Sequence, residues 1–162
     1  MIIYKSTRIG QFGKPFTIYK FRTMCVGADK MGGPSTSADD PRLTKIGKWL
    51  KKYQLDEIPQ IWNILKGDMN FIGPRPEVPE VVALMTEEEK EIIFSVKPGL
   101  SDLATLENMC EGDRLRGSAD PHQKYLDVIW PVKKKLQIKY VKTRSWLLDL
   151  QILIKTIWRI IF

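Results

Sequence analysis

The sequence is poor in the two residue types that most often bind zinc or form cross-links: its 162 residues include two cysteines and one histidine. Cys25 and Cys110 are far apart and belong to no CxxC motif. We therefore expect two free thiols in a reducing compartment rather than a disulfide framework or a zinc site. The single histidine, His122, argues against a catalytic histidine relay and against a multi-histidine metal site. Catalysis, if present, must depend on other side chains.

Long apolar runs are also absent. The N-terminal MIIYKSTRIG has neither the apolar stretch nor the small-residue cleavage site of a signal peptide. No uninterrupted apolar stretch reaches the roughly 18 residues that a membrane-spanning helix requires. The length is typical of one domain. The composition, with 43% hydrophobic and 28% charged residues, is typical of a globular protein.

Basic residues are in excess, with 26 lysines and arginines against 19 acids and a formal net charge of +7. This excess favours an anionic partner: nucleic acid, a phosphorylated metabolite or an acidic membrane surface. A nucleic-acid-binding module is disfavoured because no known module pattern is present. In addition, acids lie among the basic residues, where they would repel a phosphate backbone.

The residue pattern predicts both strands and helices. MIIYKSTRI and PFTIYKFRTM are rich in β-branched and aromatic residues, and the glycines of GQFGK between them predict a β-hairpin within residues 1–24. Residues 27–41 form a polar loop, long enough to be functional. Helical spacing and acidic or apolar patterning predict five helices: 42–53, 55–65, 85–96, 121–142 and 145–162. We expect a turn at 97–100 and an irregular polar segment at 101–120.

The last predicted helix, residues 145–162, is strongly amphipathic. One half of its helical wheel is apolar, formed by Trp146, Leu147, Leu150, Leu153, Ile154, Ile157, Trp158, Ile160 and Ile161. The other half is polar except for Leu148 and Ile152, and contains Asp149, Gln151, Lys155, Thr156 and Arg159. Tryptophans near both ends and cations on the polar half suit a helix that lies in a membrane interface. The alternative is a helix whose apolar half packs on the protein core.

Two adjacent carboxylates, Asp56 and Glu57, precede Pro59 at the start of the predicted helix 55–65. Proline is tolerated in a first helical turn. Acids at that position suit the helix dipole, so the simplest interpretation of the pair is a helix cap.

The basic residues around this pair favour a catalytic interpretation. Lys51 and Lys52 lie just upstream, and the segment IYKFRTM adds a basic strand. Arg75 lies between two prolines, which restrict its backbone and preorganise a guanidinium that grips phosphate with two N–H groups. A pair of acids among cations that bind phosphate has a chemical explanation: one carboxylate attacks phosphorus, and the other holds Mg²⁺.

The segments IYKFRTM, DPRLTKIGKWLKK, LDEIPQIWNILKGDMNFIGPRPE and VKPGLS together resemble successive motifs of the bacterial sugar transferases, the monotopic phosphoglycosyl transferases. A DP…Y…P…K…Y…S…DL…T pattern from Asp120 to Thr156 extends the resemblance over nearly the whole chain. The resemblance implies an α/β (α+β) fold. In this fold a small antiparallel N-terminal sheet is surrounded by helices, some of them amphipathic and lying on a membrane surface.

The resemblance also implies a function. Family members transfer a sugar-1-phosphate from a nucleotide diphosphate sugar, usually a UDP-sugar, to polyprenol phosphate. The implied location is the cytoplasmic face of the bacterial inner membrane. This transfer begins the assembly of a surface glycan, such as an exopolysaccharide, a capsule, an O-antigen or a glycoprotein glycan. The sugar itself is not identified by these residues.

The resemblance assigns roles to individual residues. Asp56 is the expected nucleophile, which forms a covalent phospho-sugar enzyme, and Glu57 is expected to help hold Mg²⁺. Phosphate or substrate binding is expected of five basic residues: Lys20, Arg22, Arg42, Lys51 and Arg75. Lys51 stands where many members have arginine, so it keeps the charge but lacks the guanidinium fork. The region 100–117 differs from many members, and no specificity residues are assigned there.

Family members also carry an apolar N-terminal segment that enters the membrane and turns back, immediately before the part that matches YKSTRIG. Since this chain begins at MIIYKSTRIG, we expect residues 1–162 to be a single catalytic domain without that segment. Two alternatives stay open. The chain is an active membrane-associated transferase, or it is an inactive truncated remnant that still binds nucleotide sugar or partners.

Overall fold

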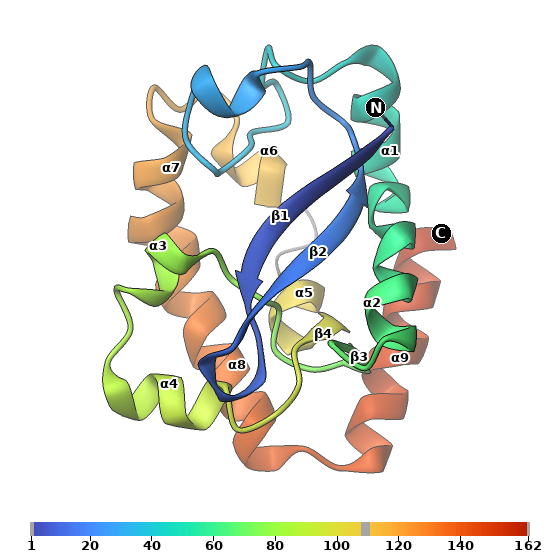
Figure 1. Ribbon diagram of the computed structural model, residues 1–162, viewed down its shortest axis with the longest axis vertical. Coiled ribbons are helices and arrows are strands. Elements are labelled where there is room, and N and C mark those ends of the chain that lie inside the picture. Colours follow the sequence, from blue (N-terminus) through green and yellow to red (C-terminus); the bar gives the residue numbers. More distant parts are fainter. Residues whose placement is uncertain (1, 108–110, 162) are drawn as a thin grey trace.

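The computed structural model describes residues 2–107 and 111–161, and the side chains of all of these except Asp29, Arg159, Ile160 and Ile161. The fold is mixed α/β, as predicted: a small antiparallel sheet at the N-terminus lies across a set of helices (Figure 1). Cys25 is a free thiol, whereas Cys110 lies outside the described residues.

The first half of the chain contains β1 (Ile3–Ile9), η1 (Gln11–Gly13), β2 (Pro15–Phe21), η2 (Ala28–Lys30), α1 (Lys45–Lys52), η3 (Leu55–Gln60), α2 (Ile61–Leu65) and β3 (Asn70–Ile72). The second half contains α3 (Pro79–Val82), α4 (Glu87–Ile93), β4 (Gly99–Ser101), α5 (Leu103–Glu107), α6 (Glu111–Leu115), α7 (Pro121–Lys124), η4 (Tyr125–Ile129), α8 (Trp130–Thr143) and α9 (Trp146–Ile161). The first three η elements are 3₁₀-helices, and η4 is a π-helical turn that leads into α8.

The predicted hairpin is confirmed. β1 and β2 pair antiparallel from Ile3 opposite Phe21 to Ile9 opposite Pro15. The turn between them uses left-handed backbone at Phe12 (φ 58°) and Gly13 (φ 71°), a conformation that glycine adopts without strain. The hairpin thereby brings the basic end of β2 back over the helices (Figure 1).

The apolar core lies between α3, α4, η4 and the start of α8. Its buried residues are Val81, Met85, Ile93, Leu115, Tyr125, Ile129 and Trp130. The helix predicted at 85–96 is present as α4, with Thr86 and Glu89 forming a capping box at its start. The helix predicted at 121–142 is present as α7, η4 and α8 in succession.

The expectation of an irregular segment at 101–120 is wrong, because α5 and α6 occupy much of it. α5 begins after Asp102, whose carboxylate accepts hydrogen bonds from the N–H and the hydroxyl of Thr105, at 2.7 and 3.0 Å. Ala104 and Leu115 are fully buried. Capping and burial therefore stabilise helices that are too short to show a clear helical period in the sequence.

The turn expected at 97–100 is also only partly right, because Gly99–Ser101 forms β4 and pairs in parallel with β3. The two segments touch through glycines. A Cβ atom on Gly73 would lie 2.6 Å from the carbonyl oxygen of Lys97, closer than a side chain tolerates. The close approach of β3 and β4 places residues 73–76, the GPRP turn, directly beside residues 98–102.

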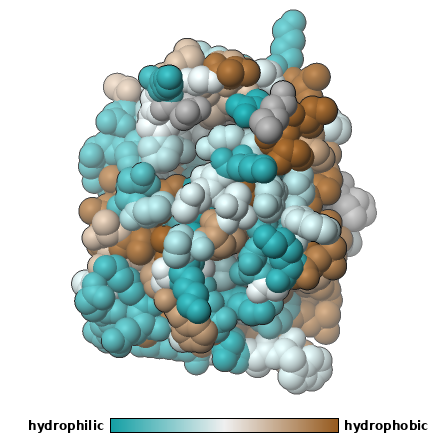
Figure 2. Space-filling view, in the orientation of Figure 1, coloured by the Kyte–Doolittle hydropathy of each residue, from teal (hydrophilic) through white to brown (hydrophobic). Residues whose placement is uncertain are grey.

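α1, α2 and α9 run along one side of the molecule (Figure 1). Large apolar side chains of these elements and of η3 face outward: Ile46, Trp49, Ile58, Ile61, Trp62, Leu65, Trp146, Leu147, Leu150, Ile154, Ile157 and Trp158. We call these residues the apolar surface. Figure 2 shows hydrophobic atoms gathered along the same side.

α9 packs on the protein with the half of its wheel that looked polar. Ile152 is 1% exposed, Asp149 accepts a 2.8 Å hydrogen bond from the Tyr140 hydroxyl, and the hydroxyls of Thr156 and Ser101 are 2.7 Å apart. By contrast Ile154 is 58% exposed. The alternative in which the apolar half packs on the core is therefore wrong. The predictions for the side chains of Arg159, Ile160 and Ile161 lie outside the described residues.

Within residues 2–107 and 111–161, no helix combines the length and the apolar character needed to cross a bilayer.

Candidate active site

The predicted helix 55–65 is present in two parts, because it begins as the 3₁₀-helix η3 and continues as α2. Gln54 follows Tyr53, the C-cap of α1, and its left-handed backbone (φ 56°) caps the start of η3. Further along, the Asn63 side chain holds α2 against the hairpin: its Nδ2 donates to the Thr17 carbonyl at 2.7 Å, and its Oδ1 accepts the Tyr19 N–H at 3.2 Å. The carboxylate pair is thus placed beside the end of β2.

Glu57 is the centre of an ion cluster. Its Oε1 accepts a hydrogen bond from the Lys20 ammonium at 2.9 Å and another from the Arg75 guanidinium. Burial alone would raise the pKa of the Glu57 carboxyl, but the charges and hydrogen bonds of Arg75 and Lys20 outweigh it and lower that pKa well below its usual range. Glu57 therefore stays ionised and keeps both cations next to the pair.

Asp56 differs from its neighbour although it is also buried, with 6% of its surface exposed. Burial raises the pKa of its carboxyl, and Glu57 adds to this, while Lys20, Lys51 and Arg75 partly offset it. The cap position of η3 is Gln54, and within the described residues no side-chain hydrogen bond caps this helix. The structure therefore gives no support to the interpretation of Asp56 as a helix cap.

Arg75 is held at several points between Pro74 and Pro76. Its N–H donates to the Asp102 carboxylate at 3.3 Å, its Nη1 donates to the Leu100 carbonyl at 3.1 Å, and its Nη2 donates to Glu57. The guanidinium is therefore fixed beside the carboxylate pair, with N–H groups in the fork geometry that suits phosphate.

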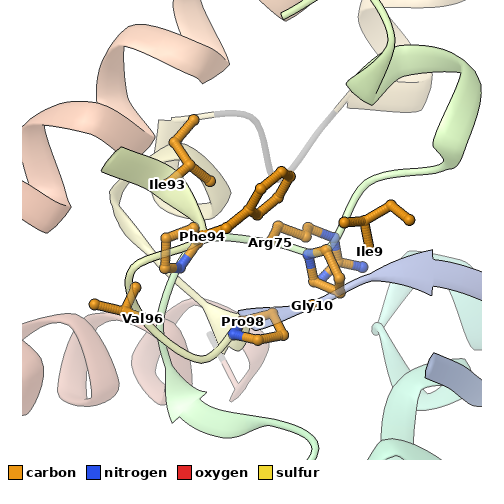
Figure 3. A pocket seen from close by; sticks show the side chains of 9 residues that line it. Ile9, Gly10, Arg75, Ile93, Phe94, Val96 and Pro98 are labelled. Atoms are coloured by element: carbon orange, nitrogen blue, oxygen red, sulfur yellow. The ribbon is translucent and has the colours of Figure 1, made fainter. Parts of the chain in front are cut away.

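Apolar side chains pack behind the GPRP turn. Figure 3 shows Arg75 close to Phe94 and Ile9, which follow α4 and end β1. The space among these side chains is about 10 Å³, room for about one water molecule. These side chains therefore pack against the turn and leave little space among them. A larger groove of about 670 Å³ lies between η1 and α4, and it is not lined by Asp56 or Glu57.

Lys51 is the third cation near the pair. Burial and the charge of Lys20 lower the pKa of its ammonium, while Asp56, Glu111 and Glu57 raise it. Of the five predicted basic residues, the structure thus brings Lys20, Lys51 and Arg75 to the carboxylates.

The other two predicted basic residues have different surroundings. Arg22 follows β2, and its guanidinium lies 5.8 Å from the centre of the Tyr4 ring. Arg42 is not part of the cluster. It forms a 2.7 Å ion pair with Asp40 and donates hydrogen bonds to the carbonyls of Ala28, Gly33 and Ser35. These contacts engage its guanidinium within the loop 25–43, and its predicted role in phosphate binding stays a prediction.

Behind Arg75 lies a second charged layer that sequence reasoning did not identify. The Lys133 ammonium of α8 is 2.8 Å from Glu77 and 3.9 Å from Glu111, and it donates to the Tyr125 hydroxyl at 3.1 Å. Tyr125 and Lys133 both belong to the DP…Y…P…K pattern, but a linear pattern does not show which residues pair.

The two carboxylates also form the donor set best suited to a metal ion. No group of three histidine, cysteine or acidic side chains in the described part of the chain is arranged to hold one. Mg²⁺, however, commonly uses only one or two carboxylates together with substrate phosphates and water. Lys20 and Arg75 both contact Oε1 of Glu57, which leaves the other oxygen for a metal ligand. The residues present therefore fit a magnesium ion that binds together with a phosphate substrate.

Comparison with known proteins gives a consistent result. Residues 1–162 match the family described as bacterial sugar transferase. An uncharacterised sugar transferase of Bacillus subtilis, EpsL, is 36% identical over 99% of this chain and 70% of its own length.

Two relatives carry names that state an activity. The UDP-N-acetylgalactosamine-undecaprenyl-phosphate N-acetylgalactosaminephosphotransferase of Aeromonas hydrophila is 34% identical over 96% of this chain. The UDP-glucose:undecaprenyl-phosphate glucose-1-phosphate transferase of Escherichia coli is 30% identical over 98% of this chain. The chain spans only 34% and 32% of the length of these two relatives.

Proposed function

The chain belongs to the bacterial sugar transferase family, and on this basis we propose that it transfers a sugar-1-phosphate from a nucleotide diphosphate sugar to polyprenol phosphate. The names of the two relatives above support this donor and acceptor, and they favour UDP as the nucleotide and undecaprenyl phosphate as the lipid. The product would be the first lipid-linked intermediate of a surface glycan.

The observation that carries the proposal is the contrast between Asp56 and Glu57. Glu57 is neutralised by two cations, whereas Asp56 is buried beside the same cations and has no ion-pair partner within the described residues. A carboxylate in this position is available to react with the phosphate that the cations bind.

In the first step, an oxygen of ionised Asp56 attacks the phosphorus that carries the sugar. A bond forms between this oxygen and phosphorus, and the bond to the leaving phosphate breaks, which releases the nucleoside monophosphate. Arg75, Lys20 and Lys51 would bind the phosphates and stabilise the charge that develops on their oxygens.

In the second step, a phosphate oxygen of polyprenol phosphate attacks the same phosphorus. The bond to Asp56 breaks, and the free carboxylate is restored. The two steps use one site in turn for a soluble donor and a lipid acceptor.

Glu57 would hold Mg²⁺ in this site, together with the substrate phosphates. When bound, Mg²⁺ supplies positive charge to the phosphate oxygens. Glu57→Gln removes a hard anionic ligand, so we expect a higher dissociation constant for Mg²⁺ in a calorimetric titration with UDP present. An unchanged constant would assign Glu57 to the ion cluster alone.

The apolar surface would face the membrane. The polyprenol acceptor of the proposed reaction is a membrane lipid, and the exposed half of α9 carries a tryptophan near each end, Trp146 and Trp158. Such a surface is expected to enter the headgroup boundary by roughly 5–10 Å. Nearby lysines and arginines would add about 1 kcal/mol each on anionic lipid, an attraction that salt weakens.

The test is turnover in detergent with Mg²⁺, polyprenol phosphate and a panel of UDP-sugars, with UMP release as the readout. Without polyprenol phosphate, we expect at most one equivalent of UMP and a mass increase of the protein by one sugar phosphate. Asp56→Asn is the control and should show neither. Binding of UDP-sugar without any UMP release would favour the inactive remnant.

A further inference from the structure

The inner face of α8 is polar and is directed at the segment that carries Arg75. Lys133 and Gln137, one helical turn apart, are both buried there. Gln137 donates from Nε2 to the carbonyl oxygen of Arg75 at 3.2 Å, and Lys133 pairs with Glu77, two residues further along. Neither residue has a role in the two proposed steps.

Gln137 completes the set of contacts that fix the Arg75 backbone. The Asp102 carboxylate accepts the N–H of Arg75 on one side, and Gln137 donates to its carbonyl on the other. The neighbouring prolines restrict the backbone but leave the orientation of both peptide planes adjustable. The two polar contacts therefore set the direction in which the guanidinium leaves the turn.

Lys133 acts on the charges around Arg75. Glu77 lies two residues after Arg75 in the chain, and the Lys133 ammonium joins Glu77 and Glu111 in one charged cluster, one helical turn from the Gln137 that contacts Arg75. Lys133 lies 2.8 Å from Glu77 and 3.9 Å from Glu111, so it provides a counter-ion for both. Without it, these carboxylates would compete with Glu57 and with a phosphate for the same guanidinium.

We propose that α8 positions Arg75 for the donor phosphate, with Gln137 orienting its backbone and Lys133 keeping Glu77 and Glu111 from pairing with its guanidinium. This inference rests on the proposed function, because the phosphate concerned is that of the donor. Gln137 and Lys133 are positioning residues, since both act through Arg75.

The first variant is Gln137→Leu, which removes the hydrogen bond without leaving a buried charge. We expect kcat/KM for the UDP-sugar to fall about tenfold, mainly through a higher KM, at a temperature where circular dichroism shows a folded protein. The matched control is Lys135→Met on the exposed face of the same helix, which should leave kcat/KM unchanged. A lower Tm with kcat/KM within about twofold of the wild type would mean that Gln137 is merely structural.

Combining the variant with Arg75→Lys tests whether Gln137 acts through Arg75. If it does, adding Gln137→Leu to Arg75→Lys should lower kcat/KM by less than about twofold further, because the guanidinium that Gln137 positions is already absent. Losses that multiply in the double variant would show that Gln137 acts independently of Arg75 and would overturn the proposal.

The role of Lys133 is tested by rescue. Lys133→Met leaves Glu77 without its counter-ion, so we expect a raised KM for the donor, and the buried unpaired charge also lowers stability. Adding Glu77→Gln removes the competing charge and should return KM toward the wild-type value. If the double variant folds but keeps the raised KM, Lys133 does not act by neutralising Glu77.

The Arg75 Nε–H signal in a ¹⁵N NMR spectrum separates failure of this inference from failure of the proposed function. It is assigned by its absence in Arg75→Lys. Gln137→Leu should shift it, and Lys135→Met should not, whether or not the wild type turns over a UDP-sugar. A wild type without turnover overturns the proposed function, whereas an unshifted signal overturns the positioning role of α8.

Discussion

Two regions of the molecule treat water in opposite ways. One is the interior between η3 and α8, which buries charged groups, and the other is the outer side formed by α1, α2 and α9, which exposes apolar groups. The interior buries charge: Asp56 and Lys133 are nearly inaccessible, and the ion pair of Glu57 with Arg75 is largely buried. The outer side exposes apolar groups instead, with Leu65 73% and Trp146 78% exposed. Both arrangements cost stability in water unless each is compensated.

The compensation differs between the two regions. Inside, Lys20, Arg75 and Lys133 each have a carboxylate partner within the chain, so these charges are retained at the cost of desolvation. Outside, the chain supplies no cover for the apolar surface in its described part, and a lipid surface would supply it. The proposed phosphate site and the proposed lipid-binding surface are therefore built in opposite ways, and mutations should affect them differently.

The largest effect is expected inside, at Asp56. Asp56→Asn should reduce kcat by far more than the tenfold that corresponds to about 1.4 kcal/mol in the barrier, because an amide does not form the phospho-enzyme. Turnover is measured by UMP release. Retention of activity within tenfold would contradict the assignment of the nucleophile.

The next largest effect compares two isoleucines of α9 that lie on opposite sides of the helix. Ile152→Ala should lower the free energy of unfolding by about 2–5 kcal/mol, because Ile152 is buried. Ile154→Ala should change it by no more than about 0.5 kcal/mol, because Ile154 is exposed. Urea unfolding measures both. Equal losses would mean that both sides of α9 pack on the protein.

A smaller effect is expected on lipid binding. Ile154→Glu and Ile157→Glu should release the protein from anionic vesicles in a cosedimentation assay while the thermal unfolding temperature stays nearly unchanged. Binding of the wild type should weaken as salt rises. Unfolding of these variants, with no vesicle binding by the wild type, would show that the apolar half of α9 packs on the protein instead of on lipid.

The smallest effect concerns pH. The pKa of Asp56 is raised, so its contribution to stability is present below the unfolded value of about 3.9 and is lost as pH rises through the folded value. Asp56→Asn should therefore gain in Tm over the wild type as pH rises. For Glu57, whose pKa is lowered, the contribution is present above about 4.3 and is lost as pH falls. If the Tm gain of Asp56→Asn over the wild type does not change with pH, the cost of burying the charged Asp56 carboxylate is not the cause of that gain.

Much of the fold was predictable from local sequence. β-branched residues and glycines predicted the hairpin, and acidic or apolar patterning predicted α1, α4, α8 and α9. α5 and α6 were missed because an Asp102 cap and long-range burial stabilise them, and neither has a periodic signature. The face of α9 that packs on the protein was also undetermined from sequence, because a helical wheel separates two faces but does not show which one the protein covers.

For the site, the sequence by itself determined the chemical types: adjacent acids at 56 and 57, an arginine between prolines at 75, and lysines at 20 and 51. Only the tertiary structure decided that Arg42 contacts a loop and that, among the residues it describes, Glu57 has ion-pair partners whereas Asp56 has none. It also decided that α9 buries Ile152 and Thr156 and presents Ile154 and Trp158. The physical reason is that residue type sets what a side chain can bind, whereas partners and exposure depend on distances between segments far apart in the chain.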